Sequence, residues 1–400
     1  MGKRDMESAS VASEGEAMRI GLVTPWSLED PGAWSGVLQP LRAHLRDVAD
    51  VADLSTVGEV AWPDRALARG LGMVSARGYL CDFGVATAWT RGRRLRRRLA
   101  AEPVDVVLAV AASSDIAFLQ VRGVPVVQVT DGTFAQLRGF YPMFASQHPL
   151  SSLQAESVTT RAIRATTRFV ASSEWAIESL VGGYGVPREA CTLAPMGAGI
   201  ETVAPDQMMS SREARWSARR EGALKVLMVS SDWERKGGEQ VLAAVSSARA
   251  RGLDVHLTVV GNGPSTMPDW ATNLGRRSAT EVSDIYQGSD VLLELAVANA
   301  AGVTLTDAAA HGLPVVATRV GGVDSIVRDS TTGVLVEPGP DLAGRAADAL
   351  VRVADARTLV RMSREARTWY EHGLAWDHWA QAAVAACENA VEDVGGLVAR

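Results

Sequence analysis

The sequence has few cysteines and histidines, the residues that most often build metal sites and disulfides. Its 400 residues include 3 cysteines and 6 histidines. Cys81, Cys191 and Cys387 are far apart and in no metal-ligand spacing, so we interpret them as reduced core thiols of a cytoplasmic protein. The histidines form no metal cluster, and neither a Ser-His-Asp set nor a carboxylate pair at hydrolase spacing is evident. The sequence therefore predicts no metal centre and no hydrolytic triad.

Long apolar runs and an excess of basic charge are also missing. No run approaches the roughly 20 residues needed to cross a bilayer. The net charge of −6 gives no indication of a nucleic-acid-binding protein. Residues 1–17 (MGKRDMESASVASEGEA) are polar and lack the apolar middle region of a signal peptide. We therefore expect a disordered lead-in there and a cytoplasmic location.

The composition indicates a globular protein, and the length indicates two domains. The chain has 47% hydrophobic and 22% charged residues, and 400 residues fit two domains of about 150–200 residues each. We predict the first domain at 18–201 and the second at 223–370. The polar stretch 202–222 between them is expected to be a linker with a short helix.

The first domain has the pattern of a parallel sheet. The apolar runs 18–26, 104–112 and 124–132 predict strands, the last two buried on both faces. Gly36 precedes a helix expected from about Val37, where the missing Cβ permits close approach of a ligand, although a plain turn explains it as well. No G-x-G-x-x-G motif follows the first strand, which argues against a dinucleotide-dependent dehydrogenase.

Two further features of this half leave alternatives open. Asp131 ends the run 124–132, at the edge where open α/β sheets bind ligands, and is either an acceptor-side carboxylate or the N-cap of the next segment. The stretch Arg91–Arg98 contains six arginines. A solvated helix face is the usual explanation, and the alternative is contact with an anionic acceptor or a membrane surface.

The second domain begins with a predicted strand at 224–230, a loop, a helix from about Glu239 and a strand at 255–260. Lys236 lies in the loop ahead of that helix, so its ammonium and the helix N-terminus are suited to holding one phosphate together.

The most informative stretch runs from residue 289 to 339. It contains a strand at 291–295, a loop with Gly302, an Ala-rich helix closed by Gly312, a second strand and a Gly-Gly loop at 321–322. Such a βαβ unit presents free backbone N–H groups and a positive dipole end to an anion. Any doubly wound α/β protein has similar turns, so the pattern alone does not decide for a ligand site.

The order of these pieces resembles the donor-binding unit of family 4 glycosyltransferases with the GT-B fold. The pieces are the Gly302 loop, the helix and strand DAAAHGLPVVAT, the Gly-Gly loop and TGVLVEPG. The Trp-Ser-Gly at 34–36 and the DWERKGG at 232–238 resemble one bacterial branch of that family. The resemblance implies an α/β fold of two Rossmann-like parallel-sheet domains facing across a cleft. It also implies that the last helix, within residues 371–400, crosses back to the first domain.

The resemblance also implies roles for residues of this chain. Lys236 and, beside it, Arg235 would bind the donor diphosphate, and the helix N-terminus at Ala300–Gly302 would stabilise it as it leaves. Other expected donor contacts are Gly36 from the first domain, Asp307 to the ribose, and Leu274, Gly275 and Arg276 near the base. We expect the catalytic residues Lys236, Arg235, Asn299 and Asp131, and the donor-binding residues Gly36, Lys236, Ala300, Ala301, Gly302, Asp307, Leu274, Gly275 and Arg276.

Three features of the family pattern are altered in this chain. Asn299 stands where the family has the first Glu of a pair, and Asp307 stands where it has the second. Ser230 and Ser231 occupy positions where an upstream Arg is expected. Asn299 can hydrogen-bond a sugar but carries no charge, and a lost charged contact costs about 1.5–3 kcal/mol.

The resemblance implies a retaining, metal-independent glycosyltransferase that uses a nucleotide-diphosphate sugar and no other cofactor. The acceptor would be a hydroxyl of a natural product or an envelope glycan. The alternative is a catalytically silent homologue that binds or activates a partner transferase. Binding of nucleic acid is not expected, whereas self-association or association with a partner transferase is left open.

Overall fold

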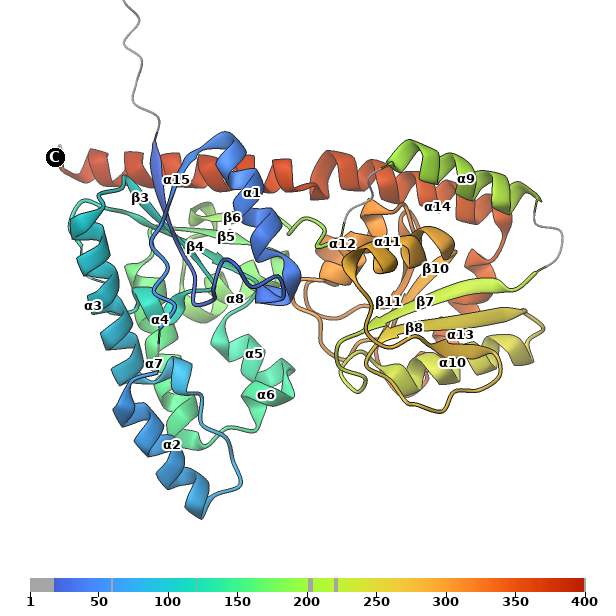
Figure 1. The fold of residues 1–400 in the computed structure, drawn as a ribbon, viewed down its shortest axis with the longest axis horizontal. Helices are drawn as coiled ribbons and strands as arrows, with labels where there is room; N and C mark the ends of the chain where they lie inside the picture. The colour runs from blue at the N-terminus through green and yellow to red at the C-terminus, as the bar shows by residue number, and fades with distance from the viewer. Residues whose placement is uncertain (1–17, 59, 120, 201–203, 219–221, 399–400) are drawn as a thin grey trace, which may run out of the picture.

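The computed structural model describes residues 18–58, 60–119, 121–200, 204–218 and 222–398. The predicted lead-in at 1–17 lies outside these ranges. The chain forms two separate six-stranded sheets, each parallel throughout and each covered by helices (Figure 1). The strand order is β2-β1-β3-β4-β5-β6 in the first sheet and β12-β11-β10-β7-β8-β9 in the second.

The first sheet has short strands with buried side chains. β3 and β4 are buried along their whole length, as the apolar runs predicted. The strands are β1 (Arg19–Val23), β2 (Asp50–Asp53), β3 (Val106–Val110), β4 (Val126–Thr130), β5 (Arg168–Ala171) and β6 (Cys191–Leu193). Their helices are α1 (Leu38–Val48), α2 (Trp62–Val74), α3 (Val85–Ala101), α4 (Ser113–Ile116), α5 (Phe134–Phe140), α6 (Pro142–Ala145), α7 (Pro149–Ala165) and α8 (Glu174–Tyr184).

The second sheet repeats this arrangement. Its strands are β7 (Leu224–Ser230), β8 (Val255–Gly261), β9 (Ala271–Asn273), β10 (Val291–Glu294), β11 (Val315–Thr318) and β12 (Gly333–Val336). Its helices are α9 (Pro205–Ala218), α10 (Gly238–Ala250), α11 (Ala279–Gly288), α12 (Val303–Ala310), α13 (Leu342–Val353) and α14 (Ala356–Trp369). β7 pairs with β10 and β8, so the loops after these three strands lie at one edge.

The last helix, α15 (Trp376–Val398), returns to the first domain as predicted. It packs along α1 and against β3, β4 and β5 (Figure 1). Its buried face consists mainly of alanines. Because these side chains are small, the helix lies close to the sheet. Trp376 and Trp379 are at most 1% exposed, and the Trp376 indole N–H donates to the carbonyl oxygen of Ala198 at 2.7 Å. Core packing therefore explains both tryptophans.

The helices at the end of the chain are interrupted between the two domains. α14 leads into a π-helical turn at Tyr370–Leu374, and Ala375 is extended with φ −65° and ψ 151°. The apolar spacing continues on both sides of this break, so periodicity alone did not reveal it. α14 packs on α9 and α12 of the second domain, whereas α15 belongs to the first.

The arginine-rich stretch is also corrected in one position. Its helix, α3, is longer than the stretch, and Arg91 is only 4% exposed. Arg91 forms ion pairs with Asp82 at 2.5 Å and with Asp115 at 3.9 Å, and Asp115 is fully buried. Arg91 is therefore an internal ion-pair residue and not part of a solvated face. The remaining arginines of the stretch, 93, 94, 96, 97 and 98, are exposed or half-buried.

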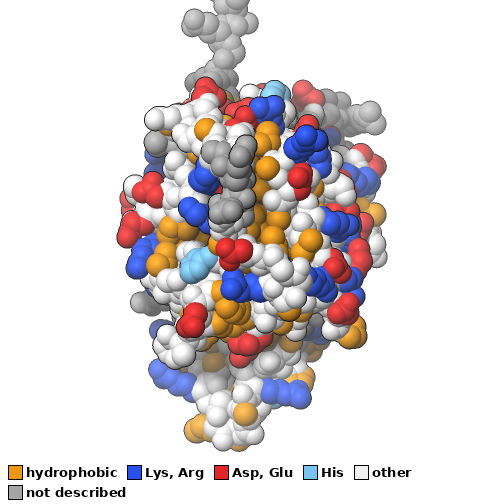
Figure 2. All heavy atoms as spheres, turned by 90° about the vertical axis from the view of Figure 1, so that its right-hand side faces the viewer, with side chains coloured by type: hydrophobic (Ala, Val, Ile, Leu, Met, Phe, Trp, Pro, Cys, Tyr) orange, Lys and Arg blue, Asp and Glu red, His pale blue; other side chains and the backbone are white. Residues whose placement is uncertain are grey.

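The described residues on the outer face of the second domain form no patch of a single charge. Figure 2 shows basic and acidic side chains interspersed on that face around hydrophobic ones. Within the described residues, no helix is long and apolar enough to span a membrane.

Candidate functional site

A buried ion pair lies where the loops after β7 and β10 meet. Lys236, in the turn before α10, is 6% exposed, and Glu294, the last residue of β10, is 3% exposed. The Lys236 ammonium donates to Glu294 Oε2 at 2.8 Å and to the Thr304 hydroxyl at 3.1 Å. Because β7 and β10 are parallel neighbours, their carboxyl ends bring these side chains together. Lys236 therefore lies beside the first turn of α12. That it shares a phosphate with the N-terminus of α10 stays a prediction.

Asn299 is held by two partners in the loop before α12. Its Oδ1 accepts the backbone N–H of Gly302 at 2.8 Å, and its Nδ2 donates to Glu294 Oε1. Gly302 is the N-cap of α12 with φ 62°, and a Cβ there would lie 2.4 Å from the Ile326 side chain. Glycine is favoured because this backbone conformation is strained for other residues and because a Cβ would force the end of the Ile326 side chain to move.

Ala300 and Arg235 meet a residue of the first domain. The Tyr141 hydroxyl accepts the N–H of Ala300 at 2.9 Å. Arg235 lies over the Tyr141 ring, 5.7 Å from its centroid, and donates to the Ala298 carbonyl oxygen at 3.1 Å. Burial raises the pKa of Tyr141, so its phenol is neutral near pH 7. Tyr141 thus joins the two domains at the predicted phosphate loop, and the N–H of Ala301 has no partner within the described residues.

Asp307 also faces the first domain. It is 5% exposed, and its Oδ1 accepts the backbone N–H groups of Gly199 and Ile200 at 2.8 and 3.0 Å. A Cβ built on Gly199 would lie 3.9 Å from the Gly36 carbonyl oxygen, so Gly36 adjoins the same turn. The structure brings Gly36 and Asp307 close to one another, while the contact of Asp307 with a ribose stays a prediction.

Asp131 lies at the carboxyl edge of the first sheet, directly after β4. Burial raises its pKa to about 6, and a hydrogen bond from the Trp34 side chain partly offsets that rise. Trp34 and Ser35 have left-handed backbone, with φ 47° and 63°, which is strained for residues other than glycine. Trp34 also stacks on Trp26, with centroids 6.1 Å apart.

The N-cap alternative for Asp131 is wrong. Thr133 caps α5, because its hydroxyl accepts the N–H of Gln136 and the Gln136 side chain accepts the N–H of Thr133 in return. Threonine followed three residues later by glutamine is a capping box, a signal that the sequence carried.

The expected base-binding residues lie at the same edge of the second sheet but two strands away from β7. Leu274, Gly275 and Arg276 follow β9, and the Gly275 carbonyl oxygen accepts the N–H of Gly261 at 2.9 Å. No described contact links them to Lys236. Their role stays a prediction.

Glu294, Thr304 and Tyr141 are site residues that the sequence reasoning missed. Glu294 carried a signal, because it is a lone carboxylate at the end of an otherwise apolar strand, VLLE. A charged residue that is buried at such a place needs a partner of opposite charge. Tyr141 gave no local signal, since its partner Ala300 lies 159 residues away in the other domain.

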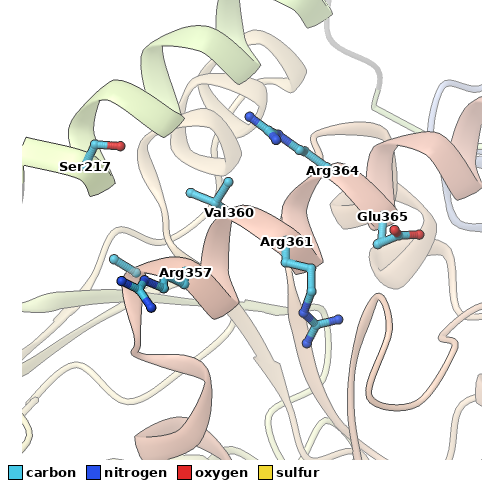
Figure 3. A pocket seen from close by; sticks show the side chains of 7 residues that line it. Ser217, Arg357, Val360, Arg361, Arg364 and Glu365 are labelled. Atoms are coloured by element: carbon cyan, nitrogen blue, oxygen red, sulfur yellow. The ribbon is translucent and has the colours of Figure 1, made fainter.

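A separate cavity of about 550 Å³ lies between α14 and the end of α9 (Figure 3). It is lined by Ser217, Ala356, Arg357, Val360, Arg361, Arg364 and Glu365, and none of these is a predicted site residue. Arg361 and Arg364 point to different sides in Figure 3, and Arg364 is paired with Glu213. Among the described residues no group of three or more His, Cys, Asp or Glu side chains could hold a metal ion.

Comparison with solved structures identifies the fold. A glycosyltransferase from Rickettsia africae superposes with a TM-score of 0.64 and 13% identity, covering 95% of this chain and 100% of that one. Anabaena Alr3699/HepE, solved with UDP and glucose, superposes with a TM-score of 0.58 and 14% identity, covering 94% and 99%. The chain has the GT-B fold. The fold prediction is therefore confirmed, including two separate sheets and a last helix that crosses back.

Sequence comparison points to the same class of protein. Residues 223–356 match the family described as "Glycosyl transferases group 1". A D-inositol 3-phosphate glycosyltransferase of Pseudarthrobacter chlorophenolicus is 27% identical over 267 residues, which span 61% of this chain and 61% of that relative. The family match includes Lys236, Glu294, Asn299 and Asp307, so this half of the GT-B chain resembles glycosyltransferases in sequence as well as in fold.

Proposed function

We propose that this GT-B protein is a retaining glycosyltransferase that moves a sugar from a nucleotide-diphosphate sugar to an acceptor hydroxyl. The observation that carries the proposal is the position of Lys236 beside the first turn of α12, in the part of the chain that matches group 1 glycosyltransferases. A buried cation and a helix N-terminus together suit a diphosphate. The Anabaena relative of this fold binds UDP and glucose, which supports a nucleotide sugar as donor.

The chemistry would be divided between the two domains. Lys236, Arg235 and the free N–H of Ala301 would donate hydrogen bonds to the diphosphate as it leaves, in a reaction that uses no metal ion and no cofactor beyond the donor. The donor phosphate would accept the acceptor proton, which accords with retention of configuration. Asp131 would bind the acceptor hydroxyl, because it lies at the facing edge of the first sheet and remains partly accessible.

The remaining donor contacts and the cellular setting are part of the same proposal. Asp307 would bind the ribose, and residues 274–276 would adjoin the base. The exposed arginines of α3 would contact an anionic acceptor or a membrane surface, and the location would be cytoplasmic. The acceptor would be a natural product or an envelope glycan.

A second candidate is a silent homologue that binds or activates a partner transferase. Two observations favour it: Asn299 is neutral, and the charge of Lys236 is already balanced by Glu294. Calorimetric titration with UDP, GDP, ADP and dTDP separates the two candidates. An enzyme should bind at least one of these nucleoside diphosphates, and absence of binding to all four would remove the transferase proposal.

Transfer then needs a direct assay. The purified chain should release nucleoside diphosphate from one nucleotide sugar in the presence of an acceptor. Release that occurs only after a partner transferase is added would favour the silent homologue.

A further inference from the structure

One buried carboxylate serves two of the predicted catalytic residues. Glu294 Oε2 accepts from the Lys236 ammonium and from the Thr304 hydroxyl, and Oε1 accepts from the Asn299 amide. All three partners lie in the turn before α10 or around the start of α12. Glu294 therefore determines where the cation and the amide of the donor site are held.

The amide of Asn299 has only one orientation that satisfies both neighbours. Its oxygen accepts the Gly302 N–H, and its nitrogen donates to Glu294. A flipped amide would place donor against donor at Gly302 and acceptor against acceptor at Glu294. The negative charge absent from position 299 is thus present one hydrogen bond away, at position 294.

The same carboxylate limits how strongly the site attracts an anion. Lys236 and Glu294 are both buried and 2.8 Å apart, so a diphosphate beside them meets a balanced pair. The remaining attraction comes from the end of α12 and from Arg235, whose charge is itself partly balanced by Asp232 at 3.7 Å. Neutralising Glu294 should strengthen attraction for an anion and remove the negative charge that favours a positively charged sugar ring.

We propose that Glu294 is a positioning residue of the donor site that supplies the charge missing at position 299. It holds Lys236 and Asn299 for transfer and weakens the hold of Lys236 on the diphosphate. This inference rests on the proposed function. It leads to a specific prediction: loss of the Glu294 charge should lower turnover and raise the affinity for the nucleoside diphosphate.

The test is Glu294→Gln in the full chain, with calorimetric titration of the best-bound nucleoside diphosphate and a transfer assay. We expect the Kd to fall three- to tenfold and kcat to fall at least tenfold. Glu337→Gln is the matched control, because Glu337 follows β12 at the same edge of the sheet and its side chain is exposed. That control should change neither quantity by more than about twofold.

A second variant separates charge from folding. In Glu294→Gln/Asn299→Asp the new amide can donate to the new carboxylate, which can still accept the Gly302 N–H. This exchange keeps the hydrogen bonds between positions 294, 299 and 302 and moves the charge to position 299. We expect kcat and Kd to return to within about threefold of the wild type, with the same far-UV circular dichroism and melting temperature.

Each of the other possible outcomes would overturn either the inference about Glu294 or the proposed function. Weaker binding together with slower transfer in Glu294→Gln, or no recovery in the exchange variant, would show a structural role alone and overturn the inference. Wild-type transfer that Glu294→Gln leaves unchanged would overturn only the inference. Failure of the wild type to bind any nucleoside diphosphate would overturn the proposed function, and the inference with it.

Discussion

The carboxyl edges of the two sheets differ in whether their buried charged side chains are paired. On the second sheet, Lys236 and Glu294 are buried and balanced against each other. On the first sheet, Asp131 has no cationic partner among the residues that the structure describes: a Trp34 hydrogen bond supports it, and burial raises its pKa to about 6. The donor-side edge therefore has its charges matched before a ligand binds. The acceptor-side edge holds a group whose charge changes close to neutral pH.

Removing the donor-side cation should give the largest effect. Lys236→Ala leaves Glu294 buried without a cation, which should lower the free energy of unfolding by about 3–5 kcal/mol. Nucleoside-diphosphate affinity should fall by about 1.5–3 kcal/mol. Urea unfolding and calorimetry measure the two effects. Lys225→Ala is the control, because the Lys225 side chain is exposed on β7 and both quantities should stay unchanged.

The acceptor-side carboxylate should make stability depend on pH. Because its folded pKa is raised from 3.8 to about 6, Asp131 stabilises the protein below pH 4, and this stability is lost as pH rises to about 6. The loss amounts to at most about 3 kcal/mol. Asp131→Asn should remove it, so the variant unfolds at higher urea than the wild type at pH 7 and similarly at pH 4. An equal difference between the two proteins at both pH values would contradict this account; the exposed Asp47→Asn serves as control.

Asn299 tests whether the neutral amide takes part in transfer. Asn299→Ala should lower kcat by roughly tenfold to a hundredfold, which corresponds to ~1.4–2.8 kcal/mol. The cause would be the loss of one hydrogen bond in the transition state, or of the hydrogen bond between Asn299 and Glu294. Steady-state transfer kinetics measure this. Wild-type activity that the change does not affect would show that Asn299 lies outside the reacting part of the site.

The contact between the domains should give the smallest effect. Tyr141→Phe removes the hydroxyl that accepts the Ala300 N–H but keeps the ring beneath Arg235. The free energy of unfolding should fall by about 1 kcal/mol, the value of one hydrogen bond. Nucleoside-diphosphate affinity should rise about two- to fivefold, because a ligand no longer competes with the hydroxyl for that N–H. Weaker binding would show instead that the Tyr141 hydroxyl contacts the donor.

Much of the fold was predictable because its strands are apolar and its turns are marked by glycine. The expected strand at 224–230 is β7, and Gly302 lies at the start of α12 as the motif required. Position along the chain placed Lys236 ahead of α10, and only the structure shows that its ammonium reaches Thr304 in the first turn of α12. What it does in the site is a prediction that awaits experiment.

The remaining features depend on partners that are distant in the sequence. Arg91 looked like part of a solvated face until the structure placed it against Asp115. Glu294 lay within a predicted strand and was given no role, and the structure shows that Lys236 and Asn299 both donate hydrogen bonds to it. The roles of Arg91 and Glu294 depend on their burial and on partners in other helices and strands. The sequence pattern around each residue contains neither.

Release of nucleoside diphosphate from a panel of nucleotide sugars tests the central claim most directly. The account predicts that the purified wild type releases it from at least one donor in an acceptor-dependent manner, and that Lys236→Ala reduces kcat/KM at least tenfold while Lys225→Ala does not. Absence of acceptor-dependent release from every donor, together with no calorimetric binding of any nucleoside diphosphate, would contradict it.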